Sequence, residues 1–126
     1  RVLSGEIAIL LDYDFNAYRA KYKDKANVEF VIPSEGTLVV PYVMSLVNKG
    51  PNAENAKKVL DFVLSDEGQA IWANAYLRPV RPKAMSAEVQ SRFLPATEYA
   101  RARTVDYGKM AAAQKAFSDR YLKEAQ

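Results

Sequence analysis

The first half of the chain is dominated by extended apolar runs. Residues 6–12 (EIAILLD) are apolar between two acids, which is typical of a strand covered on both faces. Residues 28–32 (VEFVI) predict a second strand, which ends before Pro33. A third run covers residues 37–47 (TLVVPYVMSLV), and Pro41 within it cannot donate to a sheet ladder. This run is therefore an edge strand, a bend or a hinge.

Helical periodicity dominates the rest of the chain. A short helix is expected over about 15–23, and apolar residues spaced three to four apart predict a helix after Asn52. The predicted N-caps, in chain order, are Asp14, Asn52, Ser65, Ser86 and Asp106. Trp72 lies at helical spacing with other apolar side chains and is assigned to the core. The final helix carries Met110, Ala113, Phe117 and Tyr121 on one face.

The order of these elements predicts an α/β fold that is incomplete by itself. Strand, helix, strand and a long extended crossing come first, and only helices follow. We expect a small mixed sheet with flanking helices and a helical C-terminus. The first strand has two apolar faces and too few neighbours to cover them. Together with the abrupt start at "RVLSGEI", this leads us to interpret the chain as part of something longer.

Composition narrows the possible chemistry. The 126 residues are 49% hydrophobic and 26% charged with a net charge of +3, and acids and bases are interleaved. Without a dense basic block, nucleic-acid binding is not expected. The absence of cysteine removes disulfides and thiolate chemistry, and the absence of histidine removes the usual neutral-pH general base. We expect no catalytic residues, no cofactor and no metal site.

The acidic residues after the first apolar run form the first candidate site. Ligands of open α/β sheets lie beyond the carboxyl ends of strands, near helix N-termini. Residues 12–16 (DYDFN) occupy such a place, so Asp12 and Asp14 can hold an ammonium group and Asn16 lies beside them. The alternative is that these acids only cap the following helix.

Two further segments carry candidate ligand-binding residues. In "PSEGT", Glu35 offers a carboxylate and Thr37 a hydroxyl, although this stretch can also be a plain crossing turn that needs Gly36 for its geometry. The loop "LRPVRP" places Arg78 and Arg81 between prolines, which suits bidentate anion recognition. Arginines that merely face solvent are the alternative.

The stretches "SGEIAILLDYDFNAY", "VEFVIPSEGT" and "NAENAKKVLDFVLSDEGQAIWANAY" resemble the C-terminal part of bacterial periplasmic substrate-binding proteins of ABC importers. The pattern PxEGT, followed after a gap by AxxxLDFxLSxEGQ, carries most of the likeness to the polyamine, ferric-iron and phosphonate binders. The resemblance implies a type II fold with two lobes. Residues 1–36 would belong to lobe 2, residues 37–82 to a crossing strand and helices of lobe 1, and residues 83–126 to C-terminal helices returning to lobe 2.

The resemblance also implies a function. Such proteins capture a small polar solute by closing about crossing strands, here near residues 32–43, and deliver it to a membrane permease. The implied partners are the solute, the permease and an N-terminal part of the same protein. The implied location is the periplasm, with no signal peptide in this chain.

The likeness also bears on which solute is bound. The position of Tyr13 matches an aromatic residue that stacks on the ligand of a polyamine-binding relative. In that relative, an acid stands where this chain has Tyr42 and a tryptophan where it has Val40. Both differences argue against spermidine and putrescine but leave a smaller amine open. Without histidine or adjacent tyrosines, ferric iron is disfavoured. An amine-bearing anion such as an aminophosphonate fits the mixture of acids and arginines.

Two rival hypotheses remain. The apolar stripe of residues 106–125 can instead belong to a small helical module that docks a protein partner. A carboxylate- or lysine-based enzyme is the other, because Asp106, Tyr107 and Lys109 lie close together. No nucleophile–base pairing or glycine-rich phosphate loop supports the enzyme.

Overall fold

The structure is a computed structural model, and it describes residues 1–125. The chain forms two compact units. Unit 1 consists of Arg1–Val31 and Tyr42–Ala96, and unit 2 consists of Ile32–Pro41 and Thr97–Gln126. The assignment of segments to lobes that the resemblance implies stays a prediction.

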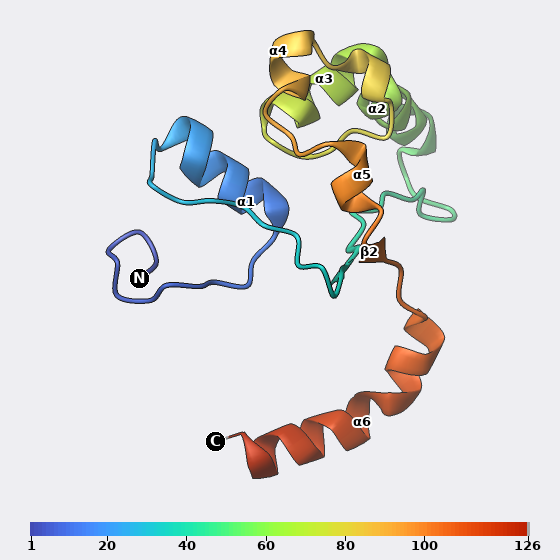
Figure 1. Cartoon of the computed structure of the whole chain (residues 1–126). Helices are drawn as coiled ribbons and strands as arrows, with labels where there is room; N and C mark the ends of the chain where they lie inside the picture. Colours follow the sequence, from blue (N-terminus) through green and yellow to red (C-terminus); the bar gives the residue numbers. More distant parts are fainter. Residues whose placement is uncertain (126) are drawn as a thin grey trace. The chain divides into compact units, whose positions relative to one another are not determined.

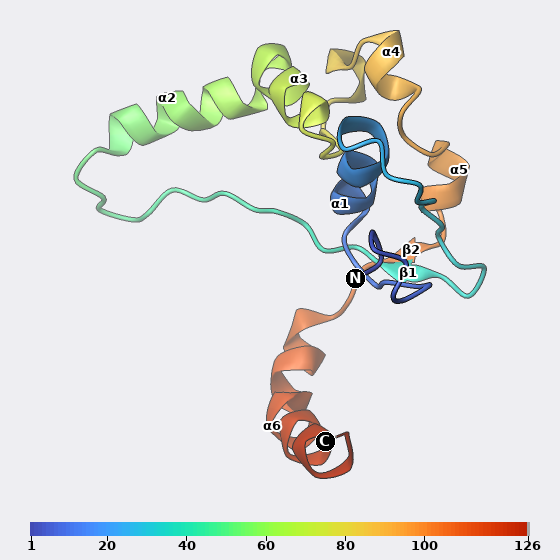
Figure 2. The same cartoon turned by 90° about the vertical axis from the view of Figure 1, so that its left-hand side faces the viewer.

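Unit 1 is helical (Figures 1 and 2). Its elements are α1 (Asp14–Tyr18), the π-helical segment η1 (Arg19–Lys23), α2 (Ala53–Leu64), α3 (Asp66–Asn74), the 3-10 turn η2 (Pro82–Ala84) and α4 (Ala87–Gln90). Unit 2 contains β1 (Thr37–Leu38), β2 (Ala102–Arg103) and α6 (Tyr107–Glu124). The short helix α5 (Ala96–Tyr99) lies where the chain passes from unit 1 to unit 2.

The predicted helix starts are confirmed at three caps. The side chains of Ser65, Ser86 and Asp106 accept hydrogen bonds from the backbone N–H three residues later, at 3.1, 3.2 and 3.0 Å. Asn52 stands at the N-cap of α2, but its side chain makes no capping bond. Asp14 is wrong as an N-cap, because Tyr13 holds that position and Asp14 begins the helix.

The predicted strands over residues 6–12 and 28–32 are wrong. Both segments are without strand structure, and in the first of them Ile9 and Leu11 are 82% and 92% exposed. A strand persists only when a neighbour satisfies its backbone groups, and neither segment has one within residues 1–125. Residues 28–32 still alternate between partly buried and exposed side chains, as an extended segment on a surface does.

The sheet is parallel and two-stranded in the described part of the chain, so the prediction of a mixed sheet is wrong there. Thr37 pairs with Ala102 and Leu38 with Arg103. The backbone N–H of Val39 donates to the carbonyl oxygen of Arg103 at 2.8 Å. The remainder of the predicted run, through residue 47, is exposed and forms no strand.

The core of unit 1 is built around Tyr18, whose side chain is 3% exposed. Its ring meets Phe30 and Phe93 edge to face, with ring centroids 5.1 and 5.2 Å apart. The backbone N–H of Leu94 donates to its hydroxyl oxygen at 3.0 Å. This tyrosine therefore joins segments that are distant in sequence.

Trp72 is not a core residue, which corrects the prediction. It is 38% exposed, whereas the adjacent Ala73 is 1% exposed. The buried positions of α3 are Gly68, Gln69 and Ala73. Because glycine and alanine make up most of this face, neighbouring segments approach the helix closely, and the indole lies on a different side.

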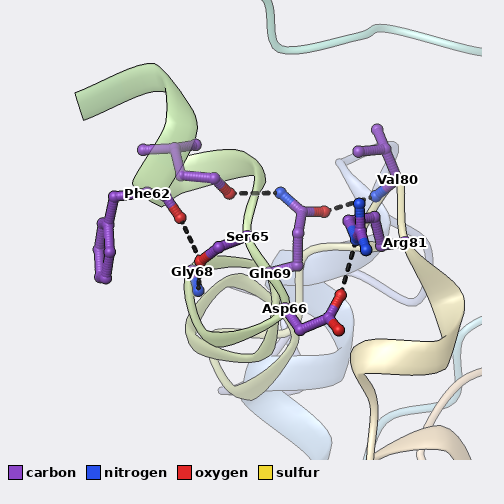
Figure 3. A network of polar contacts seen from close by, with 8 residues as sticks. Phe62, Ser65, Asp66, Gly68, Gln69, Val80 and Arg81 are labelled. Carbon is purple, nitrogen blue, oxygen red and sulfur yellow. Dashed lines mark hydrogen bonds and ion pairs between the residues drawn. The ribbon is translucent and has the colours of Figure 1, made fainter. Parts of the chain in front are cut away.

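A polar network fixes the junction between α2, α3 and the loop before η2 (Figure 3). The Gln69 side chain is 5% exposed. Its amide nitrogen donates to the carbonyl oxygen of Val63 at 2.8 Å, and its oxygen accepts from the backbone N–H of Val80 at 2.7 Å. One side chain thus satisfies backbone groups of two separate segments.

Replacing Gln69 with leucine is expected to lower the free energy of unfolding by about 2–4 kcal/mol, because two part-buried backbone groups lose their partner. Urea unfolding followed by Trp72 fluorescence measures this, since this single tryptophan lies in α3. Gln90→Leu, at an exposed position of α4, is the matched control. Equal midpoints for both variants would contradict the role of Gln69.

Helix α6 shows the predicted apolar face, and that face is open to solvent. Met110, Phe117 and Tyr121 are 53%, 67% and 56% exposed, and the last two rings stack with centroids 5.9 Å apart. Within the described part of the chain, no helix combines the length and apolar character that a membrane span requires.

Candidate functional site

The acids after the first apolar run are held by local hydrogen bonds. One oxygen of Asp12 accepts from the backbone N–H of Tyr13 at 2.7 Å and from the side-chain amide of Asn16 at 2.9 Å. One oxygen of Asp14 accepts from the backbone N–H of Phe15 at 2.8 Å. These bonds orient both carboxylates, and each carboxylate has about four acceptor positions in all.

Phe15 brings two of the predicted residues together. Its ring stacks on Tyr13 with centroids 5.4 Å apart, and it meets the edge of Tyr42 at 6.1 Å. Tyr13 and Tyr42 are 46% and 67% exposed. The result is an accessible aromatic cluster in unit 1, made of Tyr13, Phe15 and Tyr42, with Asp12 and Asp14 directly beside it in sequence.

Sequence reasoning missed Phe15 as a member of this cluster. Its place inside a short helix gives it the pattern of an ordinary packing residue. Only the contact with a residue 27 positions later, at Tyr42, reveals that it supports both tyrosines. Local patterns carry no signal for such a long-range contact.

A separate pocket in unit 2 contains Glu35 and Thr37. This open pocket of about 240 Å³ is lined by Glu35, Gly36, Thr37, Leu38 and Arg103. Hydrogen bonds from its own backbone N–H and from the Ser34 hydroxyl hold the pKa of the Glu35 carboxyl below its usual value. The carboxylate is therefore ionised at neutral pH.

The two arginines of the "LRPVRP" loop are both exposed and belong to unit 1. The Nε of Arg81 donates to the Oδ1 of Asp66 at 2.7 Å, which ties the loop to the start of α3 (Figure 3). Asp66 thus competes with any anionic ligand for Arg81. A ligand role for Arg78 and Arg81 stays a prediction.

A further pocket lies elsewhere in unit 1. This larger open pocket of about 350 Å³, lined by residues 50–55, contains none of the predicted site residues. Among residues 1–125, no three histidine, cysteine or acidic side chains gather as a metal site would need.

The sequence matches a family of binding proteins. Residues 1–112 match the profile of the family described as "Bacterial extracellular solute-binding protein". Because that match covers most of the chain, the protein belongs to this family. Proteins of such a family generally bind solutes and do not convert them.

Individual relatives support the same class. Proteins of Salmonella typhimurium, Salmonella paratyphi A and Salmonella typhi, each named "Putative 2-aminoethylphosphonate-binding periplasmic protein", are 34% identical to this chain over 73 residues. Each alignment covers 54% of this chain and 21% of the relative, so the chain matches about a fifth of the length of these relatives. No solved structure matches the chain significantly.

Proposed function

We propose that this protein is the solute-binding component of an ABC import system that captures a small amine-bearing anion. The observation that carries the proposal is the aromatic cluster of Tyr13, Phe15 and Tyr42 beside Asp12 and Asp14. It would act in the periplasm and deliver its solute to a membrane permease, without catalysing a reaction.

The chemistry of the cluster suits an ammonium group. Ring faces attract cations, and carboxylates accept the N–H bonds that the cation offers. Tyr13 presents a half-exposed ring whose orientation is fixed by the stacked Phe15. An ordered ring loses little conformational entropy when it binds a ligand.

The name of the Salmonella relatives supports an aminophosphonate as the solute. That compound carries an ammonium group at one end and an anion at the other, as the candidate residues of this chain would require. Closure about the crossing segment near residues 32–43 would follow from a higher affinity of the solute for the closed state.

Calorimetric titration with 2-aminoethylphosphonate tests the proposal. Tyr13→Leu and Tyr42→Leu are each expected to weaken binding about 5- to 30-fold, the range of one partly desolvated cation–π contact. Tyr107→Leu, which removes a comparably exposed tyrosine from α6, is the control. Absence of binding by the unaltered chain, or equal affinity of all three variants, would contradict the proposal.

The rival hypothesis of a helical interaction module has one observation in its favour. The apolar face of α6 is exposed, and residues beyond 112 lie outside the family match. A chain that binds no amine and no phosphonate in the same titration would favour this rival.

A further inference from the structure

The pocket beside the two-stranded sheet contains an arginine that no sequence motif singled out. Arg103 ends β2, and its backbone pairs in register with Leu38 of β1. Its guanidinium lies over the backbone of Gly36, where an added Cβ would be 3.9 Å from Nε. Arg103, on β2, and Glu35, in the turn before β1, thus line one pocket.

The side chain of Arg103 is unusual among the arginines of unit 2. Arg101 pairs with Glu98, and Arg120 pairs with Glu124 at 2.9 Å. Among residues 1–125, no carboxylate lies within the 4.0 Å that defines an ion pair with Arg103, although Glu35 lines the same pocket. An arginine that forms no ion pair within the described chain is available to an anion.

Glu35 restricts which anion can enter. Its carboxylate is ionised, and it repels an anion whose oxygens are all unprotonated. An oxyanion that keeps one hydroxyl avoids this repulsion, because the hydroxyl donates to the carboxylate while the charged oxygens accept from Arg103. The Thr37 hydroxyl supplies a further polar group in the same pocket.

We propose that Arg103 and Glu35 form a subsite for the hydrogen form of a phosphonate group, RPO₂(OH)⁻. Arg103 binds the two charged oxygens through its planar fork, and Glu35 accepts the P–OH proton in a hydrogen bond. This subsite lies within unit 2, and it rests on the proposed function only for the choice of a phosphonate as its ligand.

We expect the subsite to bind oxyanions that carry a hydroxyl more tightly than oxyanions that carry none. A sulfonate has no proton to donate near neutral pH, so one of its oxygens would face the Glu35 carboxylate unpaired. The second ionisation of an alkylphosphonate falls near neutral pH, as that of a phosphate ester does. Binding of a phosphonate therefore weakens as pH rises through that ionisation.

Methylphosphonate and methanesulfonate, which carry no amine, are the probes. Titrations of the unaltered chain are followed by amide chemical shifts in ¹H–¹⁵N spectra and by ³¹P spectra. Methylphosphonate is expected to shift the amides of Gly36, Thr37 and Arg103, and to bind at least about 10-fold more tightly than methanesulfonate. Its affinity falls between about pH 6 and about pH 8.5.

Variants test the two proposed roles, which are anion binding by Arg103 and hydroxyl recognition by Glu35. Arg103→Gln is expected to weaken methylphosphonate binding at least about 10-fold, and Arg103→Lys by less, because lysine keeps the charge and loses the fork. Glu35→Gln should abolish the preference over methanesulfonate. Arg120→Gln removes the same charge from α6 and should change nothing. Unchanged amide signals of Thr37 and Val39 show that each variant keeps the strand pair.

These titrations can contradict the subsite and the proposed function separately. Equal binding of both probes, or methylphosphonate affinity that is unaltered in Arg103→Gln, overturns the subsite whether or not 2-aminoethylphosphonate binds. Binding of methylphosphonate in this pocket without any binding of 2-aminoethylphosphonate would uphold the subsite and overturn the proposed function.

Discussion

Gly68→Ala is expected to lower the free energy of unfolding of unit 1 by about 3 kcal/mol or more. A Cβ at this position would lie 2.2 Å from the carbonyl oxygen of Phe62 and 2.9 Å from the Cα of Val63. These are backbone atoms at the end of α2, so no side chain can rotate away to relieve the overlap. The turn between α2 and α3 must open instead.

The Trp72 fluorescence transition in urea measures this effect, because the tryptophan follows Gly68 by one helical turn in α3. Gly108→Ala is the matched control. Its Cβ would meet only the carboxylate of Asp106, at 3.2 Å, and Gly108 lies in α6 of unit 2. The control should leave the Trp72 transition where it is. A Gly68→Ala transition at the unaltered midpoint would contradict the close approach of the two helices.

Gly36→Ala is expected to separate β1 from β2. Gly36 has φ of +107°, a conformation that side chains rarely adopt, and an added Cβ would lie 2.9 Å from the carbonyl oxygen of Arg101. That oxygen accepts from the backbone N–H of Thr37 at 3.3 Å, so moving it breaks the pairing. Backbone strain alone costs about 1–3 kcal/mol, and the contact adds to it.

Amide hydrogen exchange at Thr37 and Val39 measures the loss, and methylphosphonate binding should disappear with it. Gly5→Ala distinguishes the cost of backbone strain from the cost of a steric contact. Gly5 also has a positive φ, of +77°, but nothing lies within 4 Å of its added Cβ, so this variant reports strain without contact. If Gly36→Ala kept protected amides at Thr37 and Val39, the strand pairing would not depend on this glycine.

Local sequence patterns predicted the helices well because helix signals are local. The caps at Ser65, Ser86 and Asp106 each act on a backbone group three residues away, and the structure confirms all three. The apolar face of α6 was likewise predictable. Whether such a face is covered depends on distant segments, and within residues 1–125 it is exposed.

Strands could not be predicted with the same success, because a strand depends on its partner. The apolar run 6–12 has the composition of a buried strand, yet it pairs with nothing in the described chain. Conversely, Ala102 and Arg103 have no strand pattern and form β2 because Thr37 and Leu38 pair with them.

The candidate site was predictable in part. Tyr13 and Tyr42 were named separately, and their shared contact with Phe15 required the structure. Arg103 was missed because its relation to Glu35 comes from strand pairing across more than sixty residues. In each case the missing information was a contact between distant segments.

The junction at Ser65, Gly68 and Gln69 has a consequence for tracing evolutionary descent. Each of these residues has a structural role. Ser65 caps α3, Gly68 permits the close approach of α2, and Gln69 satisfies backbone groups of Val63 and Val80. We therefore expect the junction to be shared by homologues that transport different solutes. We expect the junction to record common ancestry, whereas differences in the bound solute should appear at the proposed ligand-binding positions Tyr13, Tyr42 and Arg103.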